Sequence, residues 1–310
     1  MIRALALALL TVVATAPAAH AASPVGLTDG FYVDPGSNPA VWVRDHPDDG
    51  RRDAIEANIA TKPIARWFGA WSGDIKTAVS GYVNKTGTKL PVLVAYNIPG
   101  RDACGGHSGG GAGTPAAYRT WISSFAAAIG TRPAVVVIEP DSLADFNCMD
   151  AARTAERTAM IKYATEQFQA KAPNTWAYLD AGNAQWVPAA TMASRLDSAG
   201  VRNVRGFAVN VSNYHTTAAS TAYGNAVSGA LPGYIKPFVI DTSRNGNGHN
   251  GEWCNPGGRR LGTPARTGGG AEMLLWVKVP GDSDGRCGKA PGVDAGKFDP
   301  QLAFDLVHGY

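Results

Sequence analysis

The sequence predicts a parallel α/β fold, and a closed or nearly closed (β/α) barrel fits its 310 residues best. Short apolar runs rich in β-branched and aromatic residues alternate with alanine-rich amphipathic stretches seven or eight times along the chain. An open doubly wound sheet is the second candidate. A nucleotide-binding sheet of that kind would need a glycine-rich turn after its first strand, and neither GxGxxG nor GxxxxGK[ST] occurs in that context. The alternation therefore favours the barrel.

The expected elements follow from this alternation, because strands need short apolar runs and helices need longer amphipathic stretches. Thr114-Pro115 marks one helix start, since a threonine cap followed by proline suits the first helical turn. Strands are expected at Ile64–Phe68, Pro91–Tyr96, Ala134–Ile138, Trp176–Leu179, Gly206–Val209, Phe238–Ile240 and Met273–Val277, with a weak one near Phe31–Val33. Helices are expected at Ala116–Ile129, Met149–Lys171, Ala189–Ala199 and His215–Ser228.

The first residues are typical of a secretory signal peptide. Arg3 supplies the positive charge, Ala4–Ala14 is a short apolar region, and Ala19-His20-Ala21 has the small-x-small form of a cleavage site. Cleavage after Ala21 and export are expected, against the alternative of a disordered alanine-rich start. Residues 22–310 are expected to form a single catalytic domain, and a monomer is expected because secreted hydrolases are most often monomeric.

Composition excludes two classes of partner. Hydrophobic residues make up 45% of the chain and charged residues 17%, which is enough to bury a large core. The net charge of +3 is mild, and no Lys/Arg cluster occurs, so nucleic-acid binding is not expected. Beyond the leader, no segment approaches eighteen uninterrupted apolar residues, so membrane insertion is not expected either.

Four cysteines in an exported chain indicate disulfides, and three pairings are possible. The spacing favours Cys104–Cys148 and Cys254–Cys287, because each pair then closes one long loop. Chain entropy alone would give roughly 4 kcal/mol of stability per bridge. A zinc site is the alternative, but no CxxC or HxxxH spacing supports it, and an oxidising compartment disfavours it. We therefore expect no metal and no cofactor.

Polar side chains follow almost every predicted strand. In a (β/α) barrel all strand carboxyl ends open on one face, and active sites are built there. Chance could place two or three Asp residues in such loops, since Asp is a turn former, but the whole set is larger. The set consists of Arg101, Asp102, Glu139, Asp141, Asp180, Asn210, Asp241, Lys278, Asp282 and Asp284.

These residues favour chemistry by paired carboxylates. Crowded carboxylates raise one another's pKa, which keeps one of them protonated as an acid near neutral pH. The six histidines are dispersed, no GxSxG motif supplies a nucleophilic serine, and the cysteines are committed. Glycoside hydrolysis is the commonest use of such a pair. Trp67, Trp186 and Trp253 lie beside the carboxylate loops and could stack on sugar rings, although core packing is the commoner role of any single tryptophan.

Two longer segments carry a family resemblance. The segment VAYNIPGRDACGGHSGGG resembles one signature of glycoside hydrolase family 6, the β-1,4-glucan hydrolases, and VVVIEPDSLA matches the other. LDAGNAQW, GFAVNVSNY, EWCNP and WVKVPGDSDG are also similar to that family, in the family's order and over nearly the whole mature chain. The resemblance implies a distorted, incomplete (β/α) barrel and an inverting mechanism.

The resemblance also implies residue roles. Asp141 would be the general acid, and Asp102 would raise its pKa and stabilise the transition state. Asp284 is the candidate base, with a water chain to Asp102, helped by Ser108, as the competing account. Tyr96 would favour ring distortion at the cleavage subsite. Sugar hydroxyls would be held by Asp180, Lys278 and Asp282 and sugar faces by Trp67, Trp186 and Trp253, with Asn210 as a further expected substrate contact.

Two departures from the family pattern stand out. Ala103 separates Asp102 from the cysteine that would follow it directly, and Asp282 replaces a common Glu. Only some thirty residues separate Cys254 from Cys287, which resembles the open-cleft endoglucanases rather than tunnel-forming exo-acting members.

Three alternatives remain open at this point: an exo-acting cellobiohydrolase, a retaining glycosidase on a similar barrel, and an inactive secreted glucan-binding protein. Of the two carboxylates in the segment Glu139-Pro140-Asp141, Asp141 is favoured over Glu139 as the general acid. Pro140 is expected to hold Glu139 in an extended conformation, so that Asp141 is lifted clear of the strand while Glu139 supports the rim.

Overall fold

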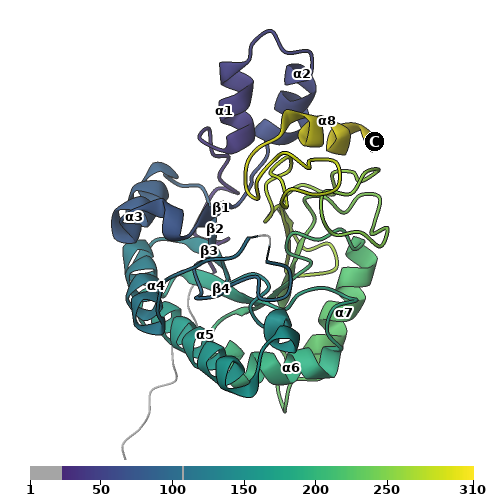
Figure 1. Ribbon diagram of the computed structural model, residues 1–310. Coiled ribbons are helices and arrows are strands. Elements are labelled where there is room, and N and C mark those ends of the chain that lie inside the picture. The colour runs from purple at the N-terminus through teal and green to yellow at the C-terminus, as the bar shows by residue number, and fades with distance from the viewer. Residues whose placement is uncertain (1–22, 107) are drawn as a thin grey trace, which may run out of the picture.

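The computed structural model of the chain describes residues 23–106 and 108–310. The predicted leader, residues 1–21, lies outside the described residues. The remainder is built around one sheet with helices along its outer side (Figure 1).

The described strands form an eight-stranded sheet in the order β1-β2-β3-β4-β5-β6-β8-β7. Every neighbouring pair is parallel except β7 with β8. The predicted parallel α/β architecture is therefore confirmed. The weak strand expected near Phe31–Val33 is a single bridge between Phe31 and Leu90. The strands are β1 (Arg66–Phe68), β2 (Val92–Ala95), β3 (Ala134–Ile138), β4 (Thr175–Asp180), β5 (Gly206–Val209), β6 (Phe238–Asp241), β7 (Arg266–Thr267) and β8 (Met273–Leu275).

The barrel is incomplete at a seam between β1 and the segment that follows β8. The Ala65 backbone N–H donates to the Trp276 carbonyl at 2.9 Å, and the Trp67 indole N–H donates to the Val277 carbonyl at 2.7 Å. A continuous ladder of the kind that joins the other parallel strands does not appear among the described pairings here. The two edges of the sheet therefore meet through isolated bonds.

Helices α3 to α7 connect successive parallel strands and form an arc around the sheet (Figure 1). In α4 the Thr114 side chain accepts from the Ala117 N–H, Pro115 is the first residue, and Gly130 ends the helix at φ 60°. The α5 cap is Asp150, one residue later than the predicted start. These helices are α3 (Ile75–Lys85), α4 (Pro115–Ile129), α5 (Ala151–Lys171), α6 (Ala189–Ser198) and α7 (Thr217–Gly229), with short 3-10 turns η3 (Ala144–Cys148) and η4 (Val201–Asn203).

The alternation fails between β6 and β8, where the fully described residues 242–272 contain only the short β7 and no helix. This segment is a long loop rich in glycine, asparagine and arginine, and it carries Cys254. It reaches over the carboxyl ends of the strands, so it helps to shape the face where the polar residues gather.

The strands bury both faces, as the apolar runs predicted. In β3, Val136 and Ile138 pack in the core shared with the surrounding helices, while Val135 and Val137 pack in a second core inside the curled sheet. All five β3 residues are 0% exposed, because successive side chains point to opposite faces and both faces are covered.

A third layer covers the seam. Helices α1 (Asn38–Asp45), α2 (Arg52–Ile55) with its π-helical continuation η1 (Glu56–Ala60), and α8 (Pro300–His308) lie together at the top of Figure 1. Ile55, Ile59, Trp276 and Ala303 share an apolar cluster there. This layer packs residues 38–60 and the C-terminal helix α8 against the open side of the barrel. None of the described helices is long and apolar enough to cross a bilayer.

Candidate active site

A cleft of about 1130 Å³ lies at the carboxyl ends of the strands. Its walls come from the loops after β1, β2, β3, β4, β5 and β8 and from the loop that carries Cys254. Ten of the twelve catalytic and substrate-binding residues predicted from the sequence line it: Trp67, Tyr96, Asp102, Ser108, Asp141, Trp186, Trp253, Lys278, Asp282 and Asp284.

The other two predicted residues, Asp180 and Asn210, lie outside the cleft lining. Asp180 is 1% exposed, and its Oδ2 accepts from the backbone N–H groups of Asp141 at 2.9 Å and Gly182 at 3.1 Å. Asn210 is 0% exposed, and its amide bonds to backbone groups of His215 and Asp241. The Asp180 Oδ2 atom and the Asn210 amide hold backbone groups inside the rim, and the predicted contact of these two residues with sugar stays a prediction.

Three strand-end carboxylates share this buried arrangement. Glu139 accepts from the backbone N–H groups of Asn97 and Ile98 at 2.9–3.1 Å. Asp241 accepts from four backbone N–H groups of neighbouring loops, in Ser212, Ser243, Val277 and Lys278. Together with Asp180, these carboxylates bind the carboxyl ends of β3, β4 and β6 to neighbouring loops. The cleft itself is lined by carboxylates farther along the loops.

Glu139 was expected to be extended because proline follows it, and this prediction is wrong. Its φ is 49°, in the left-handed region, although the residue before a proline normally favours extended backbone. The three bonds that the carboxylate accepts from the loop after β2 hold the side chain inward and oppose the local preference. The turn still brings Asp141 to the cleft.

Backbone strain gathers on this face of the barrel. Among the described non-glycine residues, those with positive φ are Asp102, Glu139, Asp141, Asn210, Ser212 and Asn255. All lie in loops at the carboxyl ends of strands, and such conformations persist only where the surroundings enforce them. The concentration of strain marks this face as a functional site.

Asp141 has the properties of a proton donor. Burial raises the pKa of its carboxyl well above the ordinary range, and the carboxylates of Asp180, Asp145 and Asp102 raise it further in that order. Lys278 opposes these effects. The resemblance implied that Asp102 raises the pKa of Asp141. Burial and the carboxylates of Asp180 and Asp145 contribute more to this shift than Asp102 does. A raised pKa is the property that allows a carboxyl to serve as a proton donor nearer to neutral pH.

Asp102 faces Ser108 in a small network. Its Oδ2 accepts from the Ser108 backbone N–H at 2.6 Å and from the Ser108 hydroxyl at 3.2 Å. The same hydroxyl lies 2.9 Å from the Tyr96 hydroxyl. Asp102, Ser108 and Tyr96 therefore form one hydrogen-bonded series along the cleft wall.

Asp284 is held as an ion. Its Oδ2 accepts from Arg244 at 2.8 Å, from the Tyr214 hydroxyl at 3.0 Å and from the Asn255 N–H at 3.1 Å, and its Oδ1 lies 3.0 Å from the Lys278 ammonium. Although burial alone would raise the pKa, Arg244 and Lys278 hold it well below the usual range. A carboxylate with two cationic partners is a weak proton acceptor.

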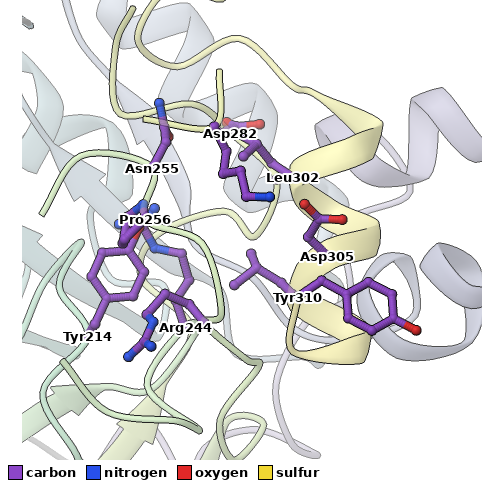
Figure 2. Close-up of a pocket in the computed structure, with 12 residues that line it drawn as sticks. Tyr214, Arg244, Asn255, Pro256, Asp282, Leu302, Asp305 and Tyr310 are labelled. Atoms are coloured by element: carbon purple, nitrogen blue, oxygen red, sulfur yellow. The ribbon is translucent and has the colours of Figure 1, made fainter. Parts of the chain in front are cut away.

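A second, much smaller cavity of about 20 Å³ lies behind this ion pair (Figure 2). Tyr214 and Arg244 lie on one side of it, and Leu302 and Asp305 of α8 lie on the other. Its volume suits about one water molecule, so it cannot hold a sugar. The helix α8 thus closes the side of this small cavity that faces Arg244, and substrate binding belongs to the large cleft.

Two other contacts fix the cleft walls. Asp282, whose pKa burial raises to about 6, accepts from the Asn38 amide with both oxygens at 2.9–3.0 Å. This contact joins α1 to the loop after β8 and so crosses the seam of the barrel. Buried Asp145 accepts from the Ala103 N–H at 2.8 Å and pairs with Arg157 at 3.4 Å. The second contact joins the loops that carry Asp102 and Asp141.

In the described part of the chain all four cysteines are paired, as Cys104–Cys148 and Cys254–Cys287. Both predicted pairings are confirmed. The first bridge forms although Ala103 separates Asp102 from Cys104. It ties the loop after β2 to the turn after β3, beside the Asp145 contact, so the two loops that bear Asp102 and Asp141 are fixed to each other twice.

Sequence reasoning missed several residues of the site. Arg244 lies three residues after Asp241, and Tyr214 lies four after Asn210. Both therefore follow a predicted strand closely, and the rule that selected the other polar residues at strand ends could have found them. Trp71, four residues beyond Trp67, also lines the cleft. Among residues 23–106 and 108–310, no group of three or more His, Cys, Asp and Glu side chains could hold a metal ion.

Comparison with known proteins agrees with this geometry. The model of "Glycosyl hydrolases family 6" matches residues 28–309. Endoglucanase 1 of Streptomyces halstedii is 59% identical over 302 residues, which cover 96% of this chain and 94% of that protein. Endoglucanase A of Thermobispora bispora is 43% identical over 97% of this chain, which spans 65% of that protein's length.

A solved structure has the same fold. The endoglucanase Cel6 from Mycobacterium tuberculosis, in complex with methyl-cellobiosyl-4-deoxy-4-thio-β-D-cellobioside, superimposes with a TM-score of 0.85 at 38% identity. The match covers 93% of this chain and 99% of the other. With a family model that spans nearly the whole described chain and relatives this similar, the chain belongs to glycosyl hydrolase family 6.

Proposed function

We propose that the chain is a secreted endo-β-1,4-glucanase that hydrolyses internal bonds of cellulose and related β-glucans with inversion of configuration. The observation that carries the proposal is the Asp141 carboxyl in a large cleft, where burial and three neighbouring carboxylates raise its pKa. The similar proteins named above are endoglucanases, and one of them was solved with a thio-linked cello-oligosaccharide. Both facts support a β-1,4-glucan as the substrate.

In this mechanism Asp141 gives its proton to the glycosidic oxygen as the bond from that oxygen to the anomeric carbon breaks. Positive charge develops on the sugar, and the nearby carboxylate of Asp102 stabilises it. A water molecule attacks the anomeric carbon from the opposite face and loses a proton to a base. The product at the anomeric carbon therefore has the inverted configuration.

The geometry favours Asp102 over Asp284 as the base. Asp284 is paired with Arg244 and Lys278, and its lowered pKa makes it a poor proton acceptor. Asp102 is linked to the Ser108 hydroxyl, which in turn meets the Tyr96 hydroxyl in the cleft. A water chain that ends at Asp102 through Ser108 can take the proton from the attacking water. Asp284 then serves to hold Lys278 in place.

The endo-acting mode follows from the shape of the site. An internal bond can reach Asp141 only if the glucan enters from the side, and a cleft permits this whereas a covered tunnel requires a chain end. The loop after β6, which reaches the site, is tied by the Cys254–Cys287 bridge to the loop after β8. An exo-acting cellobiohydrolase of the same family is the alternative function.

We expect the enzyme to lower the viscosity of carboxymethylcellulose early, before much reducing sugar has formed. Internal cuts shorten a polymer faster than cuts at its ends, so viscometry with a reducing-sugar assay separates the two modes. Accumulation of cellobiose with little change in viscosity would show exo action.

Proton NMR of fresh cello-oligosaccharide product should show the α-anomer first, and an initial β-anomer would show a retaining mechanism instead.

We expect Glu139→Gln to lower stability much more than catalysis. Glu139 is 0% exposed, and both carboxylate oxygens accept from backbone N–H groups, whereas Gln would point an NH₂ group at one donor. The cost is about 1–3 kcal/mol of unfolding free energy. Urea unfolding measures this cost, and kcat at a temperature where the variant is folded should stay within a few-fold of wild type. A loss of kcat comparable with that of an Asp141 variant would give Glu139 a direct part in the chemistry.

The localisation proposal has two supports. The leader predicted at residues 1–21 would direct export, and two disulfides suit an oxidising compartment. Residues 22–310 would act as one catalytic domain and as a monomer, with the glucan chain as the partner.

A further inference from the structure

Trp71 is an exposed aromatic residue inside the cleft that the mechanism does not use. It belongs to the 3-10 turn η2 (Ala70–Ser72), directly after β1, and 57% of it is exposed. It lines the same cleft as Trp67, which lies four residues earlier. An indole this exposed leaves a large apolar surface in contact with water. In a polysaccharide cleft such a surface suits the apolar face of a sugar ring.

The indole is held in a fixed orientation from behind. The Arg101 guanidinium lies over the Trp71 ring at 5.3 Å and over the Tyr96 ring at 4.7 Å. Arg101 is itself anchored, because its Nε donates to the Ser108 carbonyl at 2.8 Å and its Nη2 to the Gly109 carbonyl at 3.4 Å. The six-membered part of the indole also lies against Gly69, where a Cβ atom would come within 2.4 Å of the ring.

These contacts distinguish Trp71 from an incidental surface tryptophan. A mobile side chain would lose rotamer freedom when a sugar binds, whereas a side chain already fixed on one side loses little. The contacts also connect Trp71, through Arg101, to Tyr96 and Ser108 beside Asp102. Trp71 is thus a rigid part of the cleft wall.

We propose that Trp71, held by Arg101, forms a further glucose-binding subsite beyond Trp67 and makes the enzyme favour longer glucan chains. The proposal rests on the glucanase function proposed above. Glucose units close to the scissile bond meet Trp67 and Tyr96, and a unit farther along the chain stacks on Trp71. Short oligosaccharides do not reach this position, so its contribution appears only with longer substrates.

The experiment compares kcat/KM for cellohexaose with that for cellotetraose in wild type and in Trp71→Ala. We expect the ratio of the two constants to fall by about threefold to tenfold in the variant, the range that one aromatic contact commonly provides. Trp71→Phe should keep most of the wild-type ratio because it retains a flat apolar ring. Thermal unfolding of each variant shows whether the fold is retained.

Trp176→Ala is the matched control. Trp176 is also covered by an arginine, with the Arg205 guanidinium 4.3 Å from its ring, but it lies near the start of β4, at the opposite end of the strand from the cleft. Its substitution should leave the ratio unchanged. An unchanged ratio in Trp71→Ala, or an equal loss on both oligosaccharides, would overturn the subsite and leave Trp71 as a cover for Arg101. Failure of the wild-type enzyme to cleave either oligosaccharide would instead refute the proposed function.

Discussion

Asp141→Asn lowers kcat on a soluble cellulose derivative by roughly 10²- to 10⁴-fold, the contribution expected of a general acid. The raised pKa makes Asp141 a proton donor near neutral pH, and an amide has no proton of suitable acidity to give. The fold is retained, because asparagine tolerates the φ of 69° at this position and the bond to Asp180 uses the backbone N–H. Steady-state kinetics on carboxymethylcellulose and far-UV circular dichroism measure both expectations.

A second substrate makes this test specific to proton donation. An aryl cellobioside with a highly acidic phenol needs little protonation of its leaving group, so Asp141→Asn should reduce its hydrolysis far less. The alkaline limb of the pH–rate profile should also be lost in the variant, because wild-type activity falls when the Asp141 carboxyl ionises. Equal losses on both substrates, or near-normal turnover of the polymer, would remove Asp141 from the acid role.

Asp284→Ala lowers the unfolding free energy by about 3–5 kcal/mol near neutral pH, because it leaves the charges of Arg244 and Lys278 unpaired in the interior. The Asp284 side chain is only 6% exposed, and the Arg244 side chain only 3%. Urea unfolding of wild type and variant measures the difference. Asp45→Ala is the control, since its ion pair with Arg44 is exposed and its loss should have no measurable effect.

The pH dependence of this difference has a definite sign. The pKa of Asp284 is lowered in the folded state, so its stabilisation is fully present above the unfolded value of about 3.9 and is lost as pH falls toward the folded pKa. The stabilities of wild type and variant should therefore converge as the pH is lowered below about 4. A difference under about 1 kcal/mol at neutral pH, or one that persists unchanged at pH 3, would contradict the buried ion-pair arrangement.

The sheet could be predicted from the sequence because its strands are short, apolar and bounded by polar residues. The predicted bounds of β3 and β5 agree with the structure, and the other expected strands overlap theirs. The short antiparallel β7 at Arg266–Thr267 was missed, because its two residues are exposed and polar and carry no apolar pattern. The layer formed by α1 and α8 was also missed, since these short helices depend on packing against the seam rather than on a long repeat.

The site was predictable as a set of residues but only partly as a set of roles. Sequence position alone gave Asp180 and Asp141 the same description, a carboxylate near a strand end. Their difference is set by backbone direction: Asp180 is the last residue of β4 and turns into the rim, whereas Asp141 lies in a loop bent by two left-handed residues. Likewise, the role of Glu139 depends on backbone donors more than forty residues earlier in the chain, which local preference cannot reveal.

The seam between β1 and the segment after β8 determines how far the mouth of the cleft can open. In a closed barrel the hydrogen-bond ladder sets the diameter of the mouth. Here the two edges are joined by the Ala65–Trp276 and Trp67–Val277 bonds and by the Asn38–Asp282 side-chain contact. The width of the cleft mouth thus depends on one backbone bond and two side-chain contacts, and substitution at Trp67, Asn38 or Asp282 can change the side-chain contacts without rebuilding the sheet.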